Sequence, residues 1–249
     1  MVACGCNAVC FQKGRNVSAS SAIRQRSASF SNRGGRNMKQ YEVVERIKAE
    51  GICAIVRGTS ADSLNRIAKA LLDGGVGAIE VAFNTPGAAD MIRELKKNFG
   101  DSLLIGAGTV LDPENAREAI DAGATFILAP SLNVDVMRIC QRYSVLHVPG
   151  VASPTEVVRA WENGAQIVKV FPAGALGANY IKQLKGPLSQ VEMMAVGGVN
   201  LDNIRDFFKA GACSAGIGGE LVNKKLVEEG NFEEITRRAK AYKEAFNSR

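Results

Sequence analysis

A lysine interrupts one of the most apolar stretches of the chain. The segment "IVKVFPA", residues 167–173, has the β-branched and aromatic residues of a buried strand, yet Lys169 lies in its middle. Burial penalises the charged form of an amine and so increases its neutral fraction. A neutral amine attacks a ketone to form a Schiff base, and the resulting iminium accepts electrons when a neighbouring C–C bond is cleaved or formed. Lys169 is therefore the candidate nucleophile.

Glu80 is the matching candidate for proton transfer. It lies in "AIEVAF", residues 78–83, and shares one strand face with two small alanines that leave room for a carboxylate. If Glu80 and Lys169 face the same interior, the carboxylate can move the protons that each step of Schiff-base chemistry requires. The alternative is a buried salt bridge that only fills space, although such a pair rarely stabilises a fold more than apolar packing does.

Strands and helices must alternate to bring these two residues together. Buried strands are expected at residues 52–58, 78–83, 103–110, 126–131, 146–151, 167–173, 192–198 and 214–219. The segments between them have helical periodicity, and several end in a glycine suited to a left-handed helix cap, namely Gly75, Gly123, Gly164 and Gly211.

Eight strand–helix units in residues 39–249 predict an α/β fold, a single-domain (β/α)8 TIM barrel. Residues 39–50 are expected to form a short helix that closes the bottom of the barrel. An open doubly wound sheet is the alternative, but no GxGxxG motif follows the first predicted strand.

The carboxyl ends of the strands form the active site in barrels of this kind. Several side chains able to contact a substrate are expected at these ends: Arg57, Asn84, Thr109, Pro130 and Ser131. The last two strands end in the glycine pairs Gly197–Gly198 and Gly218–Gly219. Barrels often bind phosphate at these two loops through backbone N–H groups, so the pairs predict an anion site, although tight turns also use paired glycines.

The first 38 residues differ in composition from the rest. Seven of the 31 Lys and Arg residues lie in the first 40 positions, where there is no Asp or Glu, so the remaining 24 basic residues nearly balance the 25 acidic ones. The Ser-, Ala- and Arg-rich segment at residues 1–38 predicts a disordered transit peptide for the chloroplast, with the mitochondrion as the alternative. A disordered cytosolic tail is the remaining interpretation.

Composition also limits the partners of the predicted barrel. Without the leader there is no excess of basic residues, and aromatic residues make up only 6% of the chain, so we expect no nucleic-acid partner. No apolar run is long enough to cross a bilayer, so we expect no membrane segment. Cys53, Cys140 and Cys213 are expected to be reduced thiols, and His147, the only histidine, to be a hydrogen-bonded packing residue rather than a metal ligand.

Five stretches of the chain resemble the 2-keto-3-deoxy-6-phosphogluconate aldolase family of class I aldolases, also associated with 4-hydroxy-2-oxoglutarate. They are "IEVAFNTPGA", "IGAGTVLDPENAREAIDAGATFILAPS", "PGVASPTEVVRAWENGAQIVKVFPA", "GPLSQVEMMAVGGVN" and "GIGGELV". The similarity extends from about residue 43 to about residue 245, and the predicted leader adds a feature of a plant-like organellar form. The resemblance implies a homotrimer of barrels that acts on a small-molecule substrate with no cofactor and no metal.

The resemblance also implies roles for individual residues. Lys169 matches the Schiff-base lysine and Glu80 the general acid/base, while Thr109 and Pro130 match residues beside the pyruvyl group. The glycines that match those around the substrate phosphate are Gly197, Gly198, Gly218 and Gly219.

Several positions depart from the family pattern. Asn84 stands where many members have an Arg that holds the substrate carboxylate, and Arg57 is expected to supply that charge instead, unless it only forms a surface salt bridge. Ser131 replaces a common Gly, and Val196 replaces a Thr found in some members. Glu220 replaces a Ser beside the phosphate, where a carboxylate repels a dianion unless it points to solvent.

Three functions remain open from the sequence. The leading hypothesis is a lyase that cleaves a 2-keto-3-deoxy sugar acid, with or without a 6-phosphate, to pyruvate and an aldehyde. The second is an oxoacid decarboxylase that uses the same lysine. The third is a catalytically silent barrel that binds a phosphate metabolite, which the combination of Lys169 and Glu80 disfavours because a binding module needs neither.

Overall fold

Parallel strands and helices alternate through residues 38–249, the part of the chain that the computed structural model describes. The predicted transit peptide, residues 1–38, lies outside the described residues apart from Met38. The strands of the described part are β1 Ile52–Val56, β2 Ala78–Ala82, β3 Leu104–Gly108, β4 Phe126–Leu128, β5 Leu146–Val148, β6 Gly150–Val151, β7 Ile167–Val170, β8 Glu192–Val196 and β9 Ser214–Ile217. The α-helices are α2 Gln40–Glu50, α3 Ala61–Asp73, α4 Ala88–Phe99, α5 Pro113–Asp121, α6 Val134–Arg142, α7 Pro154–Glu162, α8 Ala173–Leu176, α9 Ala178–Lys185, α10 Ile204–Lys209, α11 Lys224–Glu228 and α12 Phe232–Asn247.

The strands form one parallel sheet that curves back on itself. Its order is β5-β4-β3-β2-β1-β9-β8-β7-β6, so the two terminal members, β5 and β6, are consecutive in the chain and separated only by Pro149. Proline has no N–H for a strand ladder, whereas the Pro149 carbonyl accepts a hydrogen bond of 2.8 Å from the backbone N–H of Lys169. The predicted TIM-type α/β barrel is confirmed as a nearly closed ring, with nine strand segments instead of eight because Pro149 divides the fifth.

Helix α3 illustrates how the sequence sets the helix boundaries. The Ser60 hydroxyl accepts a hydrogen bond from the N–H of Ser63 and caps the first turn. The buried stripe that follows includes Leu64, Ile67 and Leu71, which pack against the outside of the barrel. The helix ends before Gly75, whose φ of 84° lies in the left-handed region, and the other glycines predicted to end helices also have positive φ, namely Gly123, Gly164 and Gly211.

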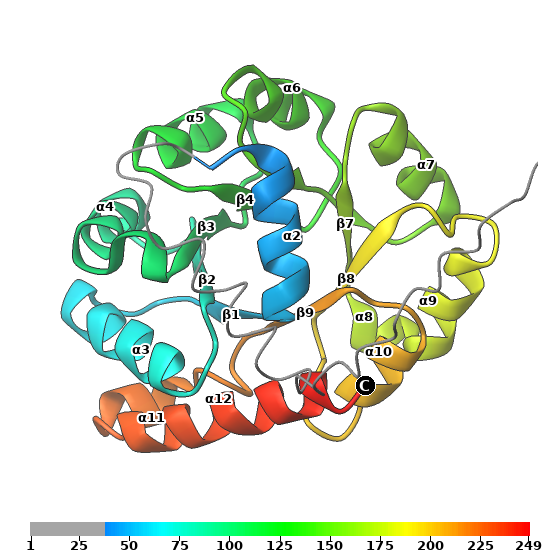
Figure 1. Cartoon of the computed structure of the whole chain (residues 1–249). Helices are drawn as coiled ribbons and strands as arrows, with labels where there is room; N and C mark the ends of the chain where they lie inside the picture. Colours follow the sequence, from blue (N-terminus) through cyan, green and yellow to red (C-terminus); the bar gives the residue numbers. More distant parts are fainter. Residues whose placement is uncertain (1–37) are drawn as a thin grey trace, which may run out of the picture. The chain divides into compact units, whose positions relative to one another are not determined.

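Alternate strand residues fill the barrel interior with a hydrophobic cluster that is separate from the layer between strands and helices. Helix α2 lies across one opening of the ring of strands (Figure 1), and its Val43, Val44 and Ile47 belong to the interior cluster. Burying each such side chain contributes about 1.5–3 kcal/mol. The predicted closing helix is confirmed. Because α2 leads directly into β1, it covers the amino ends of the strands and leaves their carboxyl ends for a site.

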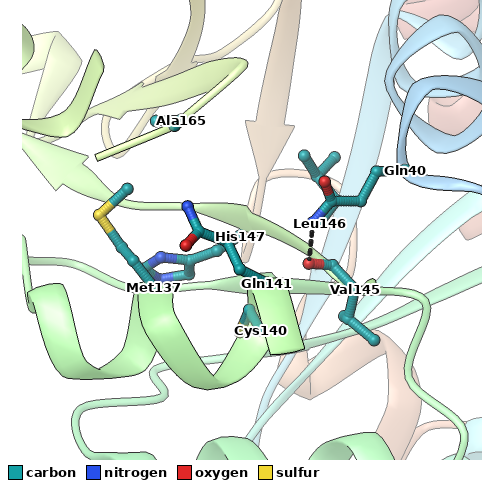
Figure 2. Close-up of a pocket in the computed structure, with 9 residues that line it drawn as sticks. Gln40, Met137, Cys140, Gln141, Val145, Leu146, His147 and Ala165 are labelled. Atoms are coloured by element: carbon teal, nitrogen blue, oxygen red, sulfur yellow. Dashed lines mark hydrogen bonds between the residues drawn. The ribbon is translucent and has the colours of Figure 1, made fainter. Parts of the chain in front are cut away.

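His147 points out of the barrel from β5 into a small cavity of about 10 Å³ beside α6 (Figure 2). Met137, Cys140 and Gln141 of α6 also line the cavity. The imidazole is buried, and neither of its nitrogens has a hydrogen-bond partner among residues 38–249. The prediction of a hydrogen-bonded packing histidine is therefore wrong in one respect, because the ring is buried without partners. Burial lowers the pKa of His147 to about 3.

This buried histidine predicts a pH-dependent stability. An unfolded imidazole binds a proton near pH 6.5 and the folded one only near pH 3, so the stabilisation is complete above about pH 6.5 and is lost as the pH falls. Between about pH 7 and about pH 5 the free energy of unfolding of the wild type should fall by about 2 kcal/mol more than that of His147→Phe. Urea titrations at the two pH values measure this difference. Equal pH dependence in both proteins would contradict the assignment.

The only titratable side chain that lines the cavity with His147 within residues 38–249 is Cys140. Burial raises the pKa of the Cys140 thiol to about 12, so it stays protonated across this pH range and contributes no slope. As expected, Cys53, Cys140 and Cys213 are free thiols. No helix in residues 38–249 is long and apolar enough to cross a membrane.

Candidate active site

Lys169 and Glu80 both project into the barrel interior, from β7 and β2. Their exposed fractions are 5% and 1%. In the ladders Glu80 is level with Ile55 of β1, whereas Lys169 is level with Met194 of β8. Both neighbours pack with the interior cluster, which agrees with the inward orientation predicted from the two-residue period of a strand.

The Glu80 carboxyl group occupies space that a glycine leaves empty. A Cβ on Gly108, at the end of β3, would overlap the carboxyl group of Glu80. The room for this carboxylate, expected from the alanines of β2, is provided by the neighbouring strand. Glu80 Oε2 is buried and has no hydrogen-bond partner in residues 38–249. Such an oxygen is free to exchange a proton with a ligand.

Burial raises the pKa of Glu80, and the positive charges of Lys169 and Arg57 oppose this shift. A carboxyl group with a raised pKa can hold a proton closer to neutral pH than an exposed one, which suits a general acid that later acts as a base.

The amine of Lys169 is not held by an ion pair. The salt bridges found in residues 38–249 include neither Lys169 nor Glu80. The Nζ atom lies 5.3 Å from the ring centroid of Phe171, two residues along the same strand face. The interpretation of Lys169 and Glu80 as a space-filling salt bridge is therefore not supported, and the amine has no carboxylate to displace before it reacts.

The rim at the carboxyl ends of the strands holds the other predicted contact residues. Arg57, Asn84 and Ser131 are exposed, and no hydrogen bond joins their side chains to another group within residues 38–249. Thr109 and Pro130 are half-buried. Thr109 has a φ of 56°, which is strained for a β-branched residue and is the kind of strain found at functional sites. These five residues remain predictions as substrate contacts.

Two loops at this end contain the glycine pairs: the β8 loop, residues 197–201, and the β9 loop, residues 218–221. Gly197 and Gly198 have φ values of 85° and 74°, so their turn requires residues without a side chain. Gly218 and Gly219 do not have such φ values, and a Cβ on either would meet no atom within 4 Å. The space beside the β9 loop is therefore open to a ligand.

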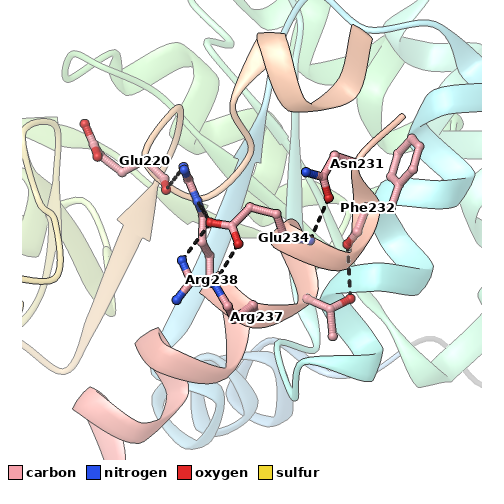
Figure 3. A network of polar contacts seen from close by, with 7 residues as sticks. Glu220, Asn231, Phe232, Glu234, Arg237 and Arg238 are labelled. Carbon is pink, nitrogen blue, oxygen red and sulfur yellow. Dashed lines mark hydrogen bonds and ion pairs between the residues drawn. The ribbon is translucent and has the colours of Figure 1, made fainter. Parts of the chain in front are cut away.

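Glu220 follows the second glycine pair and is exposed. Its carboxylate points away from the cluster formed by Glu234, Arg237 and Arg238 of α12, whereas its backbone carbonyl faces that cluster (Figure 3). Arg238 Nη1 donates a hydrogen bond of 2.9 Å to the carbonyl oxygen of Glu220. The carboxylate is thus not neutralised by the nearest arginines.

Known proteins share both the sequence and this fold. A family model described as KDPG and KHG aldolase matches residues 43–238. This chain belongs to the KDPG and KHG aldolase family. The 2-dehydro-3-deoxy-6-phosphogalactonate aldolase of Escherichia coli K12 is 36% identical over 78% of this chain and 95% of its own length. The 2-dehydro-3-deoxy-phosphogluconate aldolase of Haemophilus influenzae is 36% identical over 79% of this chain and 92% of its own length.

Solved structures agree with the family assignment. A structure described as native KDPGal has 35% sequence identity and a TM-score of 0.75, and the match covers 79% of this chain and 94% of that one. A KDPG aldolase from Legionella pneumophila, with pyruvate captured as a covalent carbinolamine intermediate, has 27% identity and a TM-score of 0.76, with coverage of 83% and 98%.

Sequence reasoning missed three features of this KDPG/KHG-type aldolase site. One is Gly108, which makes room for Glu80. Another is Gly150, where a Cβ would overlap the peptide between Pro130 and Ser131, so this glycine lets two strand ends approach each other. The third is the pair of arginines on α12. The two glycines of "GAG" in β3 were a usable signal for the first, whereas the contacts of α12 depend on long-range packing that no local pattern indicates.

Proposed function

We propose that this protein is a class I aldolase, a carbon–carbon lyase that cleaves a 2-keto-3-deoxy sugar acid to pyruvate and an aldehyde. The observation that carries the proposal is the placement of an unpaired lysine and an unpaired carboxyl group, both buried, in one barrel interior. The names of the relatives support the substrate class, and the carbinolamine captured in the Legionella enzyme supports a covalent amine adduct.

In the first half of the reaction the neutral Lys169 amine adds to the keto carbon of the substrate and forms a carbinolamine. Glu80 donates a proton to the carbinolamine hydroxyl, water leaves, and the iminium forms. The Glu80 carboxylate then accepts the proton of the C4 hydroxyl while the C3–C4 bond breaks. Its electrons move into the iminium, so the aldehyde departs and an enamine of pyruvate remains on Lys169.

The second half regenerates the enzyme. Glu80 returns its proton to C3 of the enamine, which gives the iminium of pyruvate. Water adds to that iminium, and collapse of the carbinolamine releases pyruvate and the free amine. Because burial raises the pKa of Glu80, this one carboxyl group can alternate between acid and base without help from a second residue. The residues assigned here need no metal and no organic cofactor.

The substrate carboxylate is assigned to Arg57. This side chain is exposed at the end of β1 and acts electrostatically on Glu80, so its charge lies near the reacting groups. Asn84 supplies a neutral amide at the end of β2 and does not replace that charge. Thr109 and Pro130 are proposed to flank the pyruvyl group, with Ser131 beside them at the rim.

The far end of the substrate is assigned to the β8 and β9 loops. Gly197, Gly198, Gly218 and Gly219 allow a phosphate to approach backbone N–H groups closely, as in other barrels. We propose that the loops accept a 6-phosphate but that the exposed carboxylate of Glu220 weakens its binding relative to members with Ser at this position.

Replacing Glu220 with Ser is therefore expected to increase the preference for phosphorylated substrates. Removal of a carboxylate near a phosphate dianion is worth about 1–2 kcal/mol at a solvent-exposed site, which is about a tenfold rise in the ratio of kcat/KM for a 2-keto-3-deoxy-6-phospho acid to that for its unphosphorylated form. Steady-state assays of pyruvate release measure this ratio. An unchanged ratio would show that Glu220 points to solvent in the complex.

The activity itself is tested with a panel of substrates. Pyruvate release is measured from 2-keto-3-deoxygluconate and 2-keto-3-deoxygalactonate, each with and without a 6-phosphate, and from 4-hydroxy-2-oxoglutarate and oxaloacetate. An aldolase releases an aldehyde in equal amount with pyruvate. Rapid turnover of oxaloacetate alone would instead identify a decarboxylase, and no turnover of any compound would support a silent barrel.

The oligomeric state of the protein is a separate proposal. We propose a homotrimer, as the family resemblance implies; one matching structure, a designed cage, is described as built from symmetric oligomeric domains. Light scattering of the purified protein should give about three times the chain mass.

The basic, acid-free composition of residues 1–38 supports import into the chloroplast, or alternatively the mitochondrion. Fusion of residues 1–38 to a fluorescent protein tests the destination.

A further inference from the structure

Five carbonyl oxygens of the β8 and β9 loops accept hydrogen bonds from groups of the protein itself. Gly197 O accepts from Gly174 N at 2.7 Å, and Gly198 O accepts from Asn203 Nδ2 at 2.9 Å. Asn200 O accepts from the N–H groups of Asn203 and Ile204 at 3.3 and 3.0 Å. In the β9 loop, Gly218 O accepts from the N–H groups of Leu221 and Val222, and Glu220 O accepts from Arg238 Nη1, all at 2.9 Å. A carbonyl oxygen that turned toward a bound phosphate would repel it. These hydrogen bonds therefore favour loop conformations in which the carbonyls point away from an anion.

The amides of the same loops are free. Within residues 38–249, the N–H groups of Gly198, Gly219 and Glu220 donate to no other group. Unpaired N–H groups that converge on an open space are the usual backbone donors for an anion. Each N–H shares a peptide plane with the carbonyl of the preceding residue, so the hydrogen bonds accepted by Gly197 O and Gly218 O fix the N–H groups of Gly198 and Gly219.

Arg238 is the only charged side chain in residues 38–249 that holds a carbonyl of these loops. Its Nη1 binds the Glu220 carbonyl, while its Nε donates to Glu234 Oε1 at 2.9 Å, so both sides of the guanidinium are fixed (Figure 3). Glu234 also receives two hydrogen bonds from Arg237, at 2.6 and 2.7 Å. The two arginines lower the pKa of Glu234 to about 2, so Glu234 remains an ionised anchor at neutral pH.

The N-terminal half of α12 thus connects the loop to the body of the barrel. Thr236 Oγ1 donates to the carbonyl of Ala70 on α3 at 3.0 Å, which fixes α12 against its neighbour. One turn after Arg238, Tyr242 is buried, and burial together with the nearby Glu220 carboxylate raises its pKa to about 12. Arg238 and Tyr242 therefore face the same loop from successive turns of one helix.

We propose that Arg238 is a positioning residue for substrate phosphate. It holds the Glu220 carbonyl and thereby the Glu220–Leu221 peptide, whose N–H donates to Gly218 O. The Gly218 carbonyl shares its peptide plane with the Gly219 N–H, so this chain of contacts directs the Gly219 amide toward the anion. The inference rests on the proposed aldolase function and adds a determinant of its preference for phosphorylated substrates. Arg238 acts through the backbone of Glu220 and makes no contact with the reacting carbons.

Two variants of Arg238 and one matched control test this role. Arg238→Gln removes both the guanidinium group and its charge. Arg238→Lys keeps the charge, but an ammonium group cannot bind the Glu220 carbonyl and Glu234 in the same way. The control, Arg237→Gln, removes the other arginine that binds Glu234. Arg237 is a suitable control because it is exposed and does not contact the β9 loop. The readouts are Kd for inorganic phosphate by calorimetry, the ratio of kcat/KM for phosphorylated and unphosphorylated substrates, and the thermal midpoint.

Arg238→Gln and Arg238→Lys should both weaken phosphate binding about tenfold and lower the kcat/KM ratio by a similar factor, the usual cost of losing a charge-assisted hydrogen bond. Arg237→Gln should leave both values within about twofold of wild type. Full recovery of phosphate binding by Arg238→Lys would overturn the proposal, because the charge alone would then suffice. Equal losses with both substrates would also overturn it, because they would indicate general destabilisation.

Failure of the aldolase proposal would give a different result. In that case the wild type would release no pyruvate from any substrate, whereas calorimetry with inorganic phosphate would still compare wild type with the Arg238 variants. Phosphate binding that depends on Arg238 in an enzyme without aldolase activity would keep the inference and remove only the reaction. Phosphate binding unaffected by Arg238 would remove the inference and leave the reaction intact.

Discussion

Lys169→Met is expected to lower kcat for pyruvate release by about 10⁴-fold or more, the scale seen when a covalent nucleophile is removed. Without the amine there is no iminium to accept the electrons of the C3–C4 bond, and no other group of the described interior can replace it. Cys53 also belongs to the interior cluster, but burial and the Glu80 charge raise the pKa of its thiol well above its usual range. Steady-state release of pyruvate measures the loss.

Lys169→Arg is the matched variant for this prediction. A guanidinium keeps the positive charge near Glu80 but does not form a Schiff base, because it is always protonated. Both variants should therefore be equally inactive. If Lys169→Arg retained more than about a hundredth of the wild-type kcat, the lysine would act mainly through its charge, and covalent catalysis would be excluded.

Gly108→Ala is expected to lower kcat by about 10²–10³-fold, although residue 108 makes no contact with substrate in the proposed mechanism. The added Cβ would overlap the Glu80 carboxyl group, which must then move away from its position in the barrel. General acid–base catalysis depends on hydrogen-bond geometry, so even a small displacement of the carboxyl group removes most of its contribution. Steady-state assays of pyruvate release measure kcat, and circular dichroism checks that the variant is folded.

The double variant shows whether Gly108 acts through Glu80. Glu80→Gln alone should reduce kcat by about 10²–10⁴-fold, and Gly108→Ala should add little to that loss because its target is already gone. If the two losses multiply instead, Gly108→Ala acts by a different route, such as distortion of β3. Such a result would leave Glu80 in its role but would contradict the steric account of Gly108.

The sequence was informative where a rule of local periodicity applied. Lys169 and Glu80 were predicted to face inward because side chains alternate on a strand, and both do. The closing helix was predicted from its place before the first strand, and Val43, Val44 and Ile47 do enter the interior cluster. The division of the fifth strand at Pro149 could have been predicted from the sequence, since proline has no N–H to donate to a neighbouring strand.

Other features depend on contacts between distant parts of the chain. The room for Glu80 comes from Gly108 on the neighbouring strand, so it could be predicted only after the strands were placed in register. The hydrogen bond from Arg238 to the Glu220 carbonyl joins residues 18 positions apart, across α11 and the start of α12. The unpartnered state of His147 depends on how α6 packs over β5, which its own sequence neighbours do not specify.

The most direct measurement is borohydride trapping with pyruvate, followed by mass spectrometry of peptides. Reduction of a pyruvyl iminium adds a stable group to one amine, and we predict that this amine is Lys169 and that Lys169→Arg gives no adduct. Gly108→Ala should still be labelled at Lys169, but more slowly, because the displaced Glu80 also assists the loss of water that forms the iminium. A label on another lysine, or none on the folded wild type, would contradict the claim that this buried amine forms the Schiff base.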